Sequence, residues 1–336
     1  MLKTLKIAVP MAGLGTRMRP HTWSKPKPLI GLAGKTILDY VLEQFNSIPE
    51  SIQVEYVFII GPQGDQVKAF MEEHHPDKKT NYIMQSEMRG QSDALSLARE
   101  YLTGPMLMAF SDTLVETDLS FLDSELADGV AWVKPVPDPR RFGVAHLDSD
   151  GLVTRLIEKP EDATNNLALV GFYYFHSGED LIAAIDEQTR RDISLKGEYF
   201  LADAVNILLE GGAKIRTQQV ETWMDAGTPE SLLETNRYLL KHGHDNCTDV
   251  SNYLGATIIP PVFIPADAHI EACVIGPYVS VGSECILENV IIRNSIVEEG
   301  AQVEQMILED SLIGRHVHIQ GRADRINLGD HSWAEM

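Results

Sequence analysis

The sequence LKIAVPMAGLGTRMRP occupies residues 5–20, and the tetrapeptide PKPL follows at residues 26–29. Its apolar beginning predicts a short buried β-strand. The two glycines after this strand let the backbone turn tightly and bring its N–H groups close to a ligand. Arg17 and Lys27 add two cations to the same loop. Because a polyphosphate needs close backbone donors and fixed positive charge, the stretch predicts a phosphate-binding loop behind the first strand.

Two other glycine motifs do not fit this chain. A dinucleotide-binding fingerprint requires a third glycine at the position that Met18 occupies. The tail of a P-loop is present at residues 34–36, but Leu29 stands where the first glycine of that motif belongs. The loop at residues 12–17 therefore belongs to neither of these two classes of nucleotide site.

Length and composition limit the class of protein. The chain has 336 residues, a net charge of −21 and 44% hydrophobic residues, which predicts two domains with sizeable cores. The negative charge would repel nucleic-acid phosphates, so we expect no nucleic-acid partner. Three cysteines without a zinc-binding spacing, Cys247, Cys273 and Cys285, favour free thiols. Without a long apolar stretch or a signal peptide, the sequence predicts a cytoplasmic protein with no membrane partner.

Residues 1 to about 240 alternate between strand and helix patterns. Residues 54–60 and 106–110 are apolar runs that predict buried strands, and helices are expected around residues 37–48, 95–102 and 201–208. This alternation indicates an α/β fold with a doubly wound, mostly parallel sheet. Because ligands bind beyond the carboxyl ends of such strands, the glycine loop and the residues after position 110 should converge on one cleft.

After a polar linker at residues 241–250, aliphatic residues recur every five or six positions. They are Ile258, Ile264, Ile270, Ile275, Val281, Ile286, Ile292, Val297, Val303, Leu308, Ile313 and Ile319. This is the hexapeptide repeat of a parallel β-helix, in which each short strand turns one aliphatic side chain inward. Three strands per coil give about four coils. We therefore expect domains at residues 1–243 and 251–330, with the β-helix contributing contacts to a homo-oligomer.

Two motifs together carry a family resemblance. The pattern G-x-G-T-R-x-x-P-x-T before P-K-P-L, and W-x-D-x-G-T-P at residues 223–229, resemble the signature of sugar-1-phosphate nucleotidyltransferases, also called nucleotide-sugar pyrophosphorylases. The resemblance covers roughly residues 5–240 in consistent order, and the longer members of the family carry a β-helix. It implies a Rossmann-like nucleotidyltransferase fold followed by a short left-handed parallel β-helix. It also implies an enzyme that makes an NDP-sugar and pyrophosphate from an NTP and a sugar-1-phosphate.

The resemblance assigns catalytic and metal-binding roles. Arg17 would hold the β- and γ-phosphates and the departing pyrophosphate, and Lys27 would stabilise charge at the α-phosphate. Asp112 and Asp225 would bind Mg²⁺, the expected cofactor, which prefers one or two carboxylates plus substrate phosphates. Ser111 departs from the family pattern, because a glycine usually precedes the first of these carboxylates. An isolated Asp at a strand end is also a common turn former or helix cap.

The same resemblance assigns the binding residues. The expected nucleotide-binding residues are Ala12, Gly13, Gly15, Thr16, Gln85 and Gly90, and the expected sugar-phosphate-binding residues are Gly143, Glu158, Lys159 and Gly171. A glutamine amide can pair with the edge of a base, and a glycine lets a base approach the backbone. Ser92 is expected to cap the helix that follows the base-binding segment.

The resemblance leaves open which substrates the chain binds and whether it is catalytic. By resemblance to thymidylyl- and uridylyltransferases, the Ala-Gly-x-Gly opening implies a pyrimidine nucleotide, dTTP or UTP. The overall length and the short β-helix resemble family members that act on glucose-1-phosphate. A UDP-sugar pyrophosphorylase, a mannose-1-phosphate guanylyltransferase and a non-catalytic sugar-nucleotide sensor or assembly subunit are the competing interpretations. Acetyl transfer by the β-helix is disfavoured, since four coils are few and His316 and His318 are expected on the surface. Lys25 is expected to be an extra, solvated cation, and Pro10 removes one backbone donor before the loop.

Overall fold

The computed structural model describes residues 3–246, 253 and 255–321. Contacts divide the chain into two compact units, one formed by residues 1–30 and 36–231, the other by residues 31–35 and 232–336. Residues 31–35 and 232–243 thus join the second unit, although the predicted first domain, 1–243, contained them. Parts of the predicted linker and second domain, residues 247–252, 254 and 322–330, lie outside the described residues. The domain limits remain a prediction.

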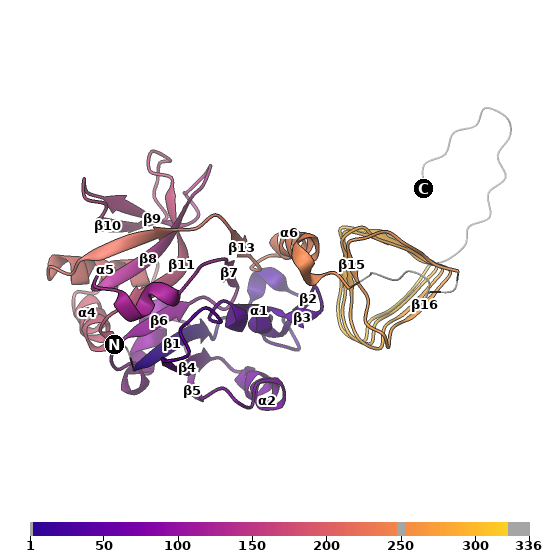
Figure 1. Ribbon diagram of the computed structural model, residues 1–336, viewed down its shortest axis with the longest axis horizontal. Helices are drawn as coiled ribbons and strands as arrows, with labels where there is room; N and C mark the ends of the chain where they lie inside the picture. Colours follow the sequence, from indigo (N-terminus) through magenta and orange to yellow (C-terminus); the bar gives the residue numbers. More distant parts are fainter. Residues whose placement is uncertain (1–2, 247–252, 254, 322–336) are drawn as a thin grey trace. The chain divides into compact units, whose positions relative to one another are not determined.

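Four parallel strands form the centre of the first unit. They are β1 (Thr4–Met11), β4 (Gln53–Ile60), β5 (Thr80–Met84) and β6 (Met106–Ala109), in the spatial order β6-β1-β4-β5 (Figure 1). The chain therefore moves from β1 to β4 and β5 in one direction, then returns to the other side of β1 for β6. Since crossovers between parallel strands are right-handed, this reversal sends helices to both faces of the sheet.

Helices cover the two faces as the reversal requires. On one face lie α1 (Ile37–Glu43) and α2 (Gly64–His74), linked by a 2.7 Å contact between Asp39 Oδ1 and His75 Nε2. On the other face, α3 (Gln91–Leu97), α4 (Gly178–Arg190) and α5 (Leu201–Glu210) bury Leu95, Leu181 and Val205 in one core with residues of β1, β4 and β6. The predicted doubly wound sheet is confirmed.

Antiparallel strands extend the sheet beyond β6. The main path of the sheet is β10-β9-β11-β6-β1-β4-β5, with β8 paired to β11 and β12. The added strands are β8 (Gly129–Pro135), β9 (Gly143–Leu147), β10 (Val153–Glu158), β11 (Leu167–Phe175) and β12 (Ile215–Gln219). The sheet is therefore parallel at its centre and antiparallel on one side. A separate two-stranded ladder joins β7 (Thr113–Val115) to β13 (Trp223–Asp225).

Two local predictions in this unit differ from the structure. The helix expected over residues 37–48 ends at Glu43, because the Gln44 side chain pairs with the β7 backbone, donating to Thr113 O at 3.0 Å and accepting from Val115 N at 2.8 Å. Ser92 does not cap α3. The N-cap is Gly90, and the Ser92 hydroxyl is buried inside the helix without a hydrogen bond.

The second unit combines a helix, a loop and a coil of strands. Helix α6 (Pro229–Leu239) and the π-helical turn η5 (Leu240–His244) enter it. The Ala33 amide donates to Asn236 Oδ1 of α6 at 2.9 Å and to Ser280 Oγ of the coil at 3.1 Å, and the Gly31 amide donates to Glu298 Oε1 at 3.1 Å. These bonds explain why residues 31–35 belong to this unit.

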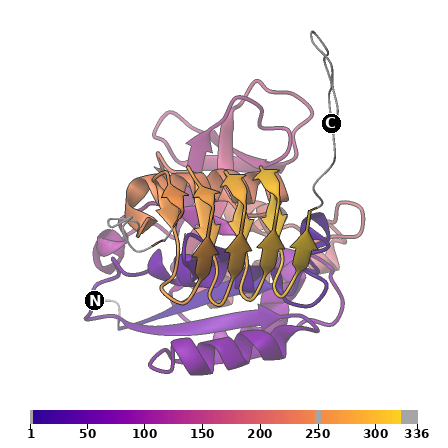
Figure 2. The same cartoon turned by 90° about the vertical axis from the view of Figure 1, so that its right-hand side faces the viewer.

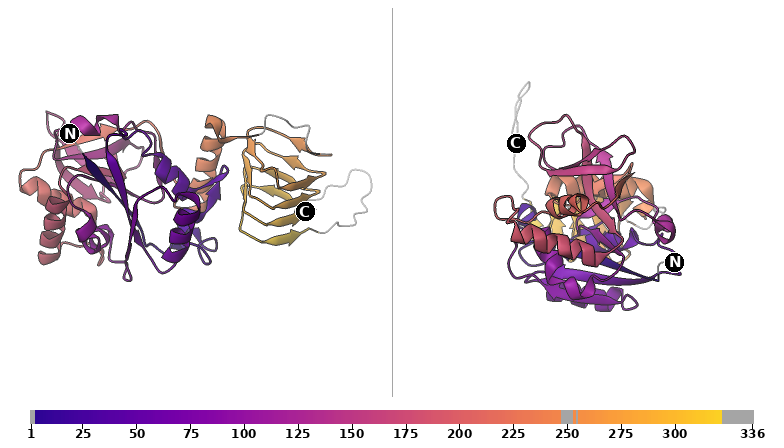
Figure 3. Two further views of the ribbon diagram at one scale, coloured as in Figure 1. Left: turned by 60° about the horizontal axis from the view of Figure 1, so that its bottom comes forward. Right: turned by 90° about the vertical axis from the view of Figure 1, so that its left-hand side faces the viewer.

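Twelve short strands form three parallel sheets of four strands each (Figures 1 and 2). Figure 1 shows the coils end on as superimposed triangular outlines, and the left view of Figure 3 shows them from the side. In chain order they are β14 (Thr257–Ile258), β15 (Val262–Phe263), β16 (His269–Glu271), β17 (Val274–Ile275), β18 (Val279–Val281), β19 (Ile286–Glu288), β20 (Ile291–Arg293), β21 (Ile296–Val297), β22 (Gln302–Glu304), β23 (Ile307–Glu309), β24 (Leu312–Ile313) and β25 (His318–Gln320). Four coils of a parallel β-helix are confirmed.

One inward position of the repeat was wrong. The register places Ile270, Leu287, Val303 and Ile319 opposite one another, so Leu287, not Ile286, faces the interior. The side chain of Cys285 already points inward and is fully buried, and alternation along the strand then sends the next residue outward. Cys273 and Cys285 are free and buried as expected, whereas Cys247 lies outside the described residues.

The remaining elements are short: β2 (Gly31–Leu32), β3 (Lys35–Thr36) and the 3-10 helices η1 (Thr16–Met18), η2 (Lys27–Leu29), η3 (Arg99–Tyr101) and η4 (Ser120–Ser124). Within the described residues, no helix combines the length and the apolar character needed to span a membrane.

Candidate functional site

The sheet topology brings the predicted site residues to one edge. The glycine loop follows β1, the segment containing Gln85 follows β5, and Asp112 follows β6, all at the carboxyl ends of parallel strands. The chain reverses direction between β1 and β6, which is the position where open α/β sheets bind ligands. The antiparallel strands β9, β10 and β11 bring Gly143, Glu158 and Gly171 to the same edge.

The glycine loop is shaped by contacts that the sequence did not indicate. Gly15 has φ +58°, and a Cβ there would lie 2.9 Å from Thr22 Cγ2 and 3.4 Å from Lys27 Cβ. The buried Thr22 hydroxyl donates to the Gly15 carbonyl oxygen at 2.8 Å. Thr22 therefore closes the loop onto itself. In contrast, a Cβ at Gly13 would meet nothing within 4 Å, which leaves its backbone open to a ligand.

Lys27 and Asp112 form an ion pair across the switch point. The Lys27 ammonium donates to Asp112 Oδ2, and the two side chains are 14% and 17% exposed. Burial by itself would raise the pKa of Asp112, but the Lys27 ammonium, assisted by Arg17, holds that pKa below its usual value. Asp112 is thus kept ionised, and the ion pair holds the Lys27 ammonium at the carboxyl ends of the parallel strands.

The β7–β13 ladder brings Asp225 beside this pair. Asp225 lies opposite Thr113, the residue after Asp112, and the Ala226 amide donates to the Asp112 carbonyl oxygen at 2.9 Å. Burial, and next the negative charge of Asp112, raise the pKa of Asp225. The two carboxyl groups therefore share one electrostatic environment, although 113 positions separate them in the chain (225 − 112).

Gly227 positions Arg17 in the same cluster. A Cβ on Gly227 would lie 2.9 Å from Arg17 Nη2 and 2.9 Å from Asp225 Oδ1. The Gly227 amide donates to Asp225 Oδ1 at 3.1 Å, which orients the carboxylate. Only a residue without a side chain leaves room for the guanidinium here. Arg17, Lys27, Asp112 and Asp225 consequently form one charged cluster.

This cluster fits a divalent cation. Asp112 and Asp225 are half-buried neighbours, and burial and next the charge of Asp112 raise the pKa of Asp225, so a cation bound between them would favour its ionised form. Mg²⁺ combines one or two carboxylates with substrate phosphate oxygens, which matches the donor set. Asp112 and Asp225 are the residues that would hold it.

The predicted base-binding segment is docked against another part of the chain. Gly90 has φ +105°, and a Cβ there would lie 2.5 Å from Tyr199 O and 2.6 Å from Tyr199 N. The Tyr199 amide donates to Arg89 O at 2.8 Å, and the Ser92 amide donates to Tyr199 O at 3.1 Å. Glycine is thus required here by the approach of the Tyr199 backbone, a packing role that the sequence did not reveal.

The predicted sugar-binding residues also lie together. Glu158 pairs with Gly143 in the β9–β10 ladder, and a Cβ on Gly143 would lie 3.0 Å from Glu158 Oε2. Burial raises the pKa of Glu158, with Lys159 opposing the shift. The Lys159 ammonium lies 4.7 Å from the centre of the Phe200 ring. Gly171 is buried with φ +79°, and the Phe110 ring occupies the place that its side chain would need.

Two residues near the loop differ from expectation or from the family pattern. Lys25 was expected to be a solvated cation, but its side chain is only 2% exposed, so that prediction was wrong. It follows Thr22 and Trp23 on a segment that folds back over the loop, and burial of its long side chain is a tertiary effect. Pro10 lies within β1 opposite Ile59 and keeps the strand paired in spite of its missing donor.

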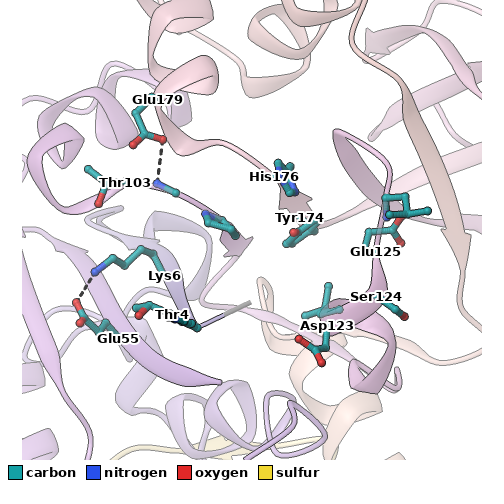
Figure 4. Close-up of a pocket in the computed structure, with 15 residues that line it drawn as sticks. Thr4, Lys6, Glu55, Thr103, Asp123, Ser124, Glu125, Tyr174, His176 and Glu179 are labelled. Carbon is teal, nitrogen blue, oxygen red and sulfur yellow. Dashed lines mark hydrogen bonds and ion pairs between the residues drawn. The ribbon is translucent and has the colours of Figure 1, made fainter. Parts of the chain in front are cut away.

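One cavity of about 760 Å³ lies away from this cluster (Figure 4). It is bordered by Lys3 and Thr4 at the beginning of β1 and by residues 103–105 before β6, which places it at the opposite edge of the sheet. Several of its charged groups have partners already: Lys6 pairs with Glu55, Glu125 pairs with Arg216, and Glu179 accepts from the Gly104 amide at 2.9 Å. None of the predicted site residues borders it.

Comparison with known proteins gives consistent matches. A family model described as Nucleotidyl transferase matches residues 9–242. The chain is 30% identical to a glucose-1-phosphate thymidylyltransferase of Streptomyces griseus, over 99% of each chain. It is 33% identical to a low-salt glycan biosynthesis nucleotidyltransferase of Haloferax volcanii, over 96% of this chain and 98% of that protein. A nucleoside-diphosphate-sugar pyrophosphorylase structure from Vibrio cholerae RC9 shares the fold, with a TM-score of 0.61 and 21% identity over 69% of this chain and 99% of that one.

Proposed function

The chain belongs to the nucleotidyl transferase family and is a sugar-1-phosphate nucleotidyltransferase, and on that premise we propose that it joins dTTP or UTP to glucose-1-phosphate. The products would be the corresponding NDP-glucose and pyrophosphate. The predicted family and the predicted class of enzyme are confirmed by the comparisons. The choice of glucose-1-phosphate and of a thymidine or uridine nucleotide is supported by the name of the Streptomyces relative and by the Ala-Gly-x-Gly opening.

The observation that carries the proposal is the charged cluster of Arg17, Lys27, Asp112 and Asp225 at the switch point of the sheet. In the reaction, a phosphate oxygen of glucose-1-phosphate attacks the α-phosphorus in line. The bond between the α-phosphorus and its bridging oxygen breaks, and pyrophosphate leaves. No covalent enzyme intermediate is required, so catalysis consists of positioning and charge stabilisation.

Each member of the cluster has a role in this proposal. Lys27 would release Asp112 when substrate binds and would stabilise the charge that develops on the α-phosphate oxygens. Arg17, whose guanidinium lies beside Gly227, would hold the β- and γ-phosphates and the departing pyrophosphate. A magnesium ion held by Asp112 and Asp225 would supply Lewis-acid neutralisation of the phosphates. The open backbone at Gly13 would donate to phosphate oxygens.

The two substrates would bind at different positions along the carboxyl-end edge of the sheet. Ala12, Gly13, Gly15 and Thr16 would hold the phosphates, with Gln85 and Gly90 recognising the base. Neighbouring strands lie about 5 Å apart, so two strand spacings separate the β5 loop from the β1 loop by about 10 Å, which suits a nucleoside lying across them. On the other side of β1, Gly143, Glu158 and Gly171 would hold the sugar hydroxyls, and Lys159 would guide the sugar phosphate.

A substrate grid tests the proposal. Five NTPs are combined with glucose-1-phosphate, mannose-1-phosphate and N-acetylglucosamine-1-phosphate in the presence of Mg²⁺, and pyrophosphate release is measured with the sugar nucleotide identified by mass. We expect the highest kcat/KM with dTTP or UTP and glucose-1-phosphate. Lys68→Met, which removes an exposed ammonium from α2, serves as the control for charge loss. Pyrophosphate release that is highest with GTP, or absent with every pair, would refute the proposal.

A further inference from the structure

The carboxamide of Gln85 is held in one orientation. Its Nε2 atom donates to Asp93 Oδ2 at 2.9 Å and to the Gly90 carbonyl oxygen at 3.3 Å. An ionised carboxylate and a carbonyl oxygen can only accept hydrogen bonds. The amide nitrogen must therefore face them, because the reverse orientation would set the amide oxygen against two other oxygens. Both amide hydrogens are used by these two bonds.

The amide oxygen of Gln85 is consequently the end left for a ligand. Among the described residues, Gln85 Oε1 accepts no hydrogen bond, yet the side chain is 4% exposed. Unlike Gln188 Oε1, it is not sealed from solvent. Because solvent reaches this oxygen, a ligand N–H can reach it too and can replace the water that would otherwise donate to it. The residue directly follows β5, at the strand edge where the nucleotide is proposed to bind.

An oxygen presented alone distinguishes bases by their ring nitrogen. Among the pyrimidines, uracil and thymine carry a hydrogen on N3, whereas N3 of cytosine is an acceptor at the same place on a ring of the same size; the larger guanine carries its ring hydrogen on N1. Adenine likewise presents an acceptor, N1. A free glutamine could rotate its amide to suit either kind of base, since it has a donor end and an acceptor end. A locked glutamine cannot.

We propose that Asp93 is a positioning residue that fixes the Gln85 amide and thereby makes the site select a base with a ring N–H, uracil or thymine, over cytosine. The proposal rests on the proposed function, because it requires an NTP base beside Gln85. Asp93 occupies the first turn of α3, and its ion pair with Arg89, 3.4 Å from Arg89 Nε to Asp93 Oδ1, uses the carboxylate oxygen that does not bind Gln85. The side chain of Arg89 is 55% exposed and makes no hydrogen bond to Gln85 among the described residues, so Arg89→Ala removes a neighbouring charge but not the Asp93–Gln85 bond and offers a matched control.

The test compares UTP with CTP in the full-length protein. Pyrophosphate release with glucose-1-phosphate is measured for the wild type, Asp93→Ala, Asp93→Asn and Arg89→Ala. We expect the wild type to prefer UTP and Asp93→Ala to lower the UTP/CTP ratio of kcat/KM by about tenfold or more. The loss should arise from a higher KM for UTP and a lower KM for CTP, with the KM for glucose-1-phosphate unchanged. Asp93→Asn retains an acceptor oxygen and should keep the ratio within about threefold. Arg89→Ala should keep it as well.

Two outcomes would overturn the proposal: a wild type that uses CTP as well as UTP, or an Asp93→Ala variant with the wild-type ratio. If circular dichroism shows that Asp93→Ala does not fold, Asp93→Leu, a good helix former of similar size without a hydrogen-bond acceptor, replaces it with the same expectation. Calorimetric binding of UTP and CTP with Mg²⁺, without sugar phosphate, gives the ratio even if the chain does not turn over. A failure of the proposed function therefore appears as absent turnover, and a failure of this inference as an unchanged binding ratio.

Discussion

Replacing Gly90 by alanine should loosen the docking of the base-binding segment on Tyr199. The backbone at Gly90 has φ +105°, a conformation that costs a residue with a side chain on the order of 1–3 kcal/mol. The new Cβ would lie 2.5 Å from Tyr199 O, so the segments that contain Gly90 and Tyr199 must move apart. Their two hydrogen bonds, of 2.8 and 3.1 Å, would weaken, each worth about 0.5–1.5 kcal/mol. Together these effects give about 2–6 kcal/mol.

Gly212→Ala provides the matched control. Gly212 has φ +93°, but a Cβ there would meet nothing within 4 Å, so its substitution carries strain of about 1–2 kcal/mol without a collision. The difference between the two variants, about 2 kcal/mol, is the cost of undocking. It corresponds to about 30-fold faster exchange of the Tyr199 and Ser92 amide hydrogens.

Hydrogen–deuterium exchange followed by mass spectrometry measures this difference, and steady-state kinetics measure its consequence. We expect Gly90→Ala to raise the KM for the NTP, while the KM for the sugar phosphate stays close to the wild-type value. Equal protection of Tyr199 in the two alanine variants would refute the claim that its backbone is what requires glycine at position 90.

Three further predictions follow from the charged cluster and the β-helix. Lys27→Met should lower kcat by about a hundredfold or more while changing the KM for sugar phosphate far less, and comparable losses in both would contradict its role at the α-phosphate. Because burial and Asp112 raise the folded-state pKa of Asp225, ionising this group destabilises the metal-free fold as pH rises above about 4. Asp225→Asn should therefore raise the Tm at pH 7 and leave it unchanged below about pH 3.5, whereas a lower Tm at pH 7 would reverse the sign. Ile291 and Ile307 are paired on one outer face of the β-helix and are 48% and 77% exposed, so we expect this face to contribute to a homo-oligomer. Replacing both by Glu should lower the molecular mass measured by light scattering, and an unchanged mass would exclude this face as the oligomer interface.

Much of the fold was predictable because its signals are local. The apolar run before the glycine loop, the alternation of strands and helices, and the repeat of aliphatic residues after position 250 each depend on neighbours a few positions away. The sheet topology then followed in outline, since right-handed crossovers and carboxyl-end binding are general rules. The single inward position that was wrong, Ile286 in place of Leu287, differs by one residue, which is enough to exchange the two faces of a strand.

The sequence proposes the residues of the candidate site, but it does not predict how they are arranged. The sequence named Arg17, Lys27, Asp112 and Asp225 through motifs whose order matches a family. It contained no sign that Lys27 would pair with Asp112, nor that burial would enclose Lys25. Such contacts depend on which segments the folded chain brings together, and spacing along the sequence does not encode them.

The sequence by itself determined the kinds of groups that the candidate site and the second unit contain: a glycine loop, two cations, two carboxylates and a repeat that winds into a β-helix. Only the tertiary structure decided how they act on one another. The β7–β13 ladder sets Asp225 beside Asp112, the Tyr199 backbone leaves no room for a side chain at position 90, and Asp93 accepts a hydrogen bond from the amide nitrogen of Gln85. The physical reason is that local conformation follows from each residue and its near neighbours, whereas charge, hydrogen bonding and steric approach act through space between segments that are distant in the chain.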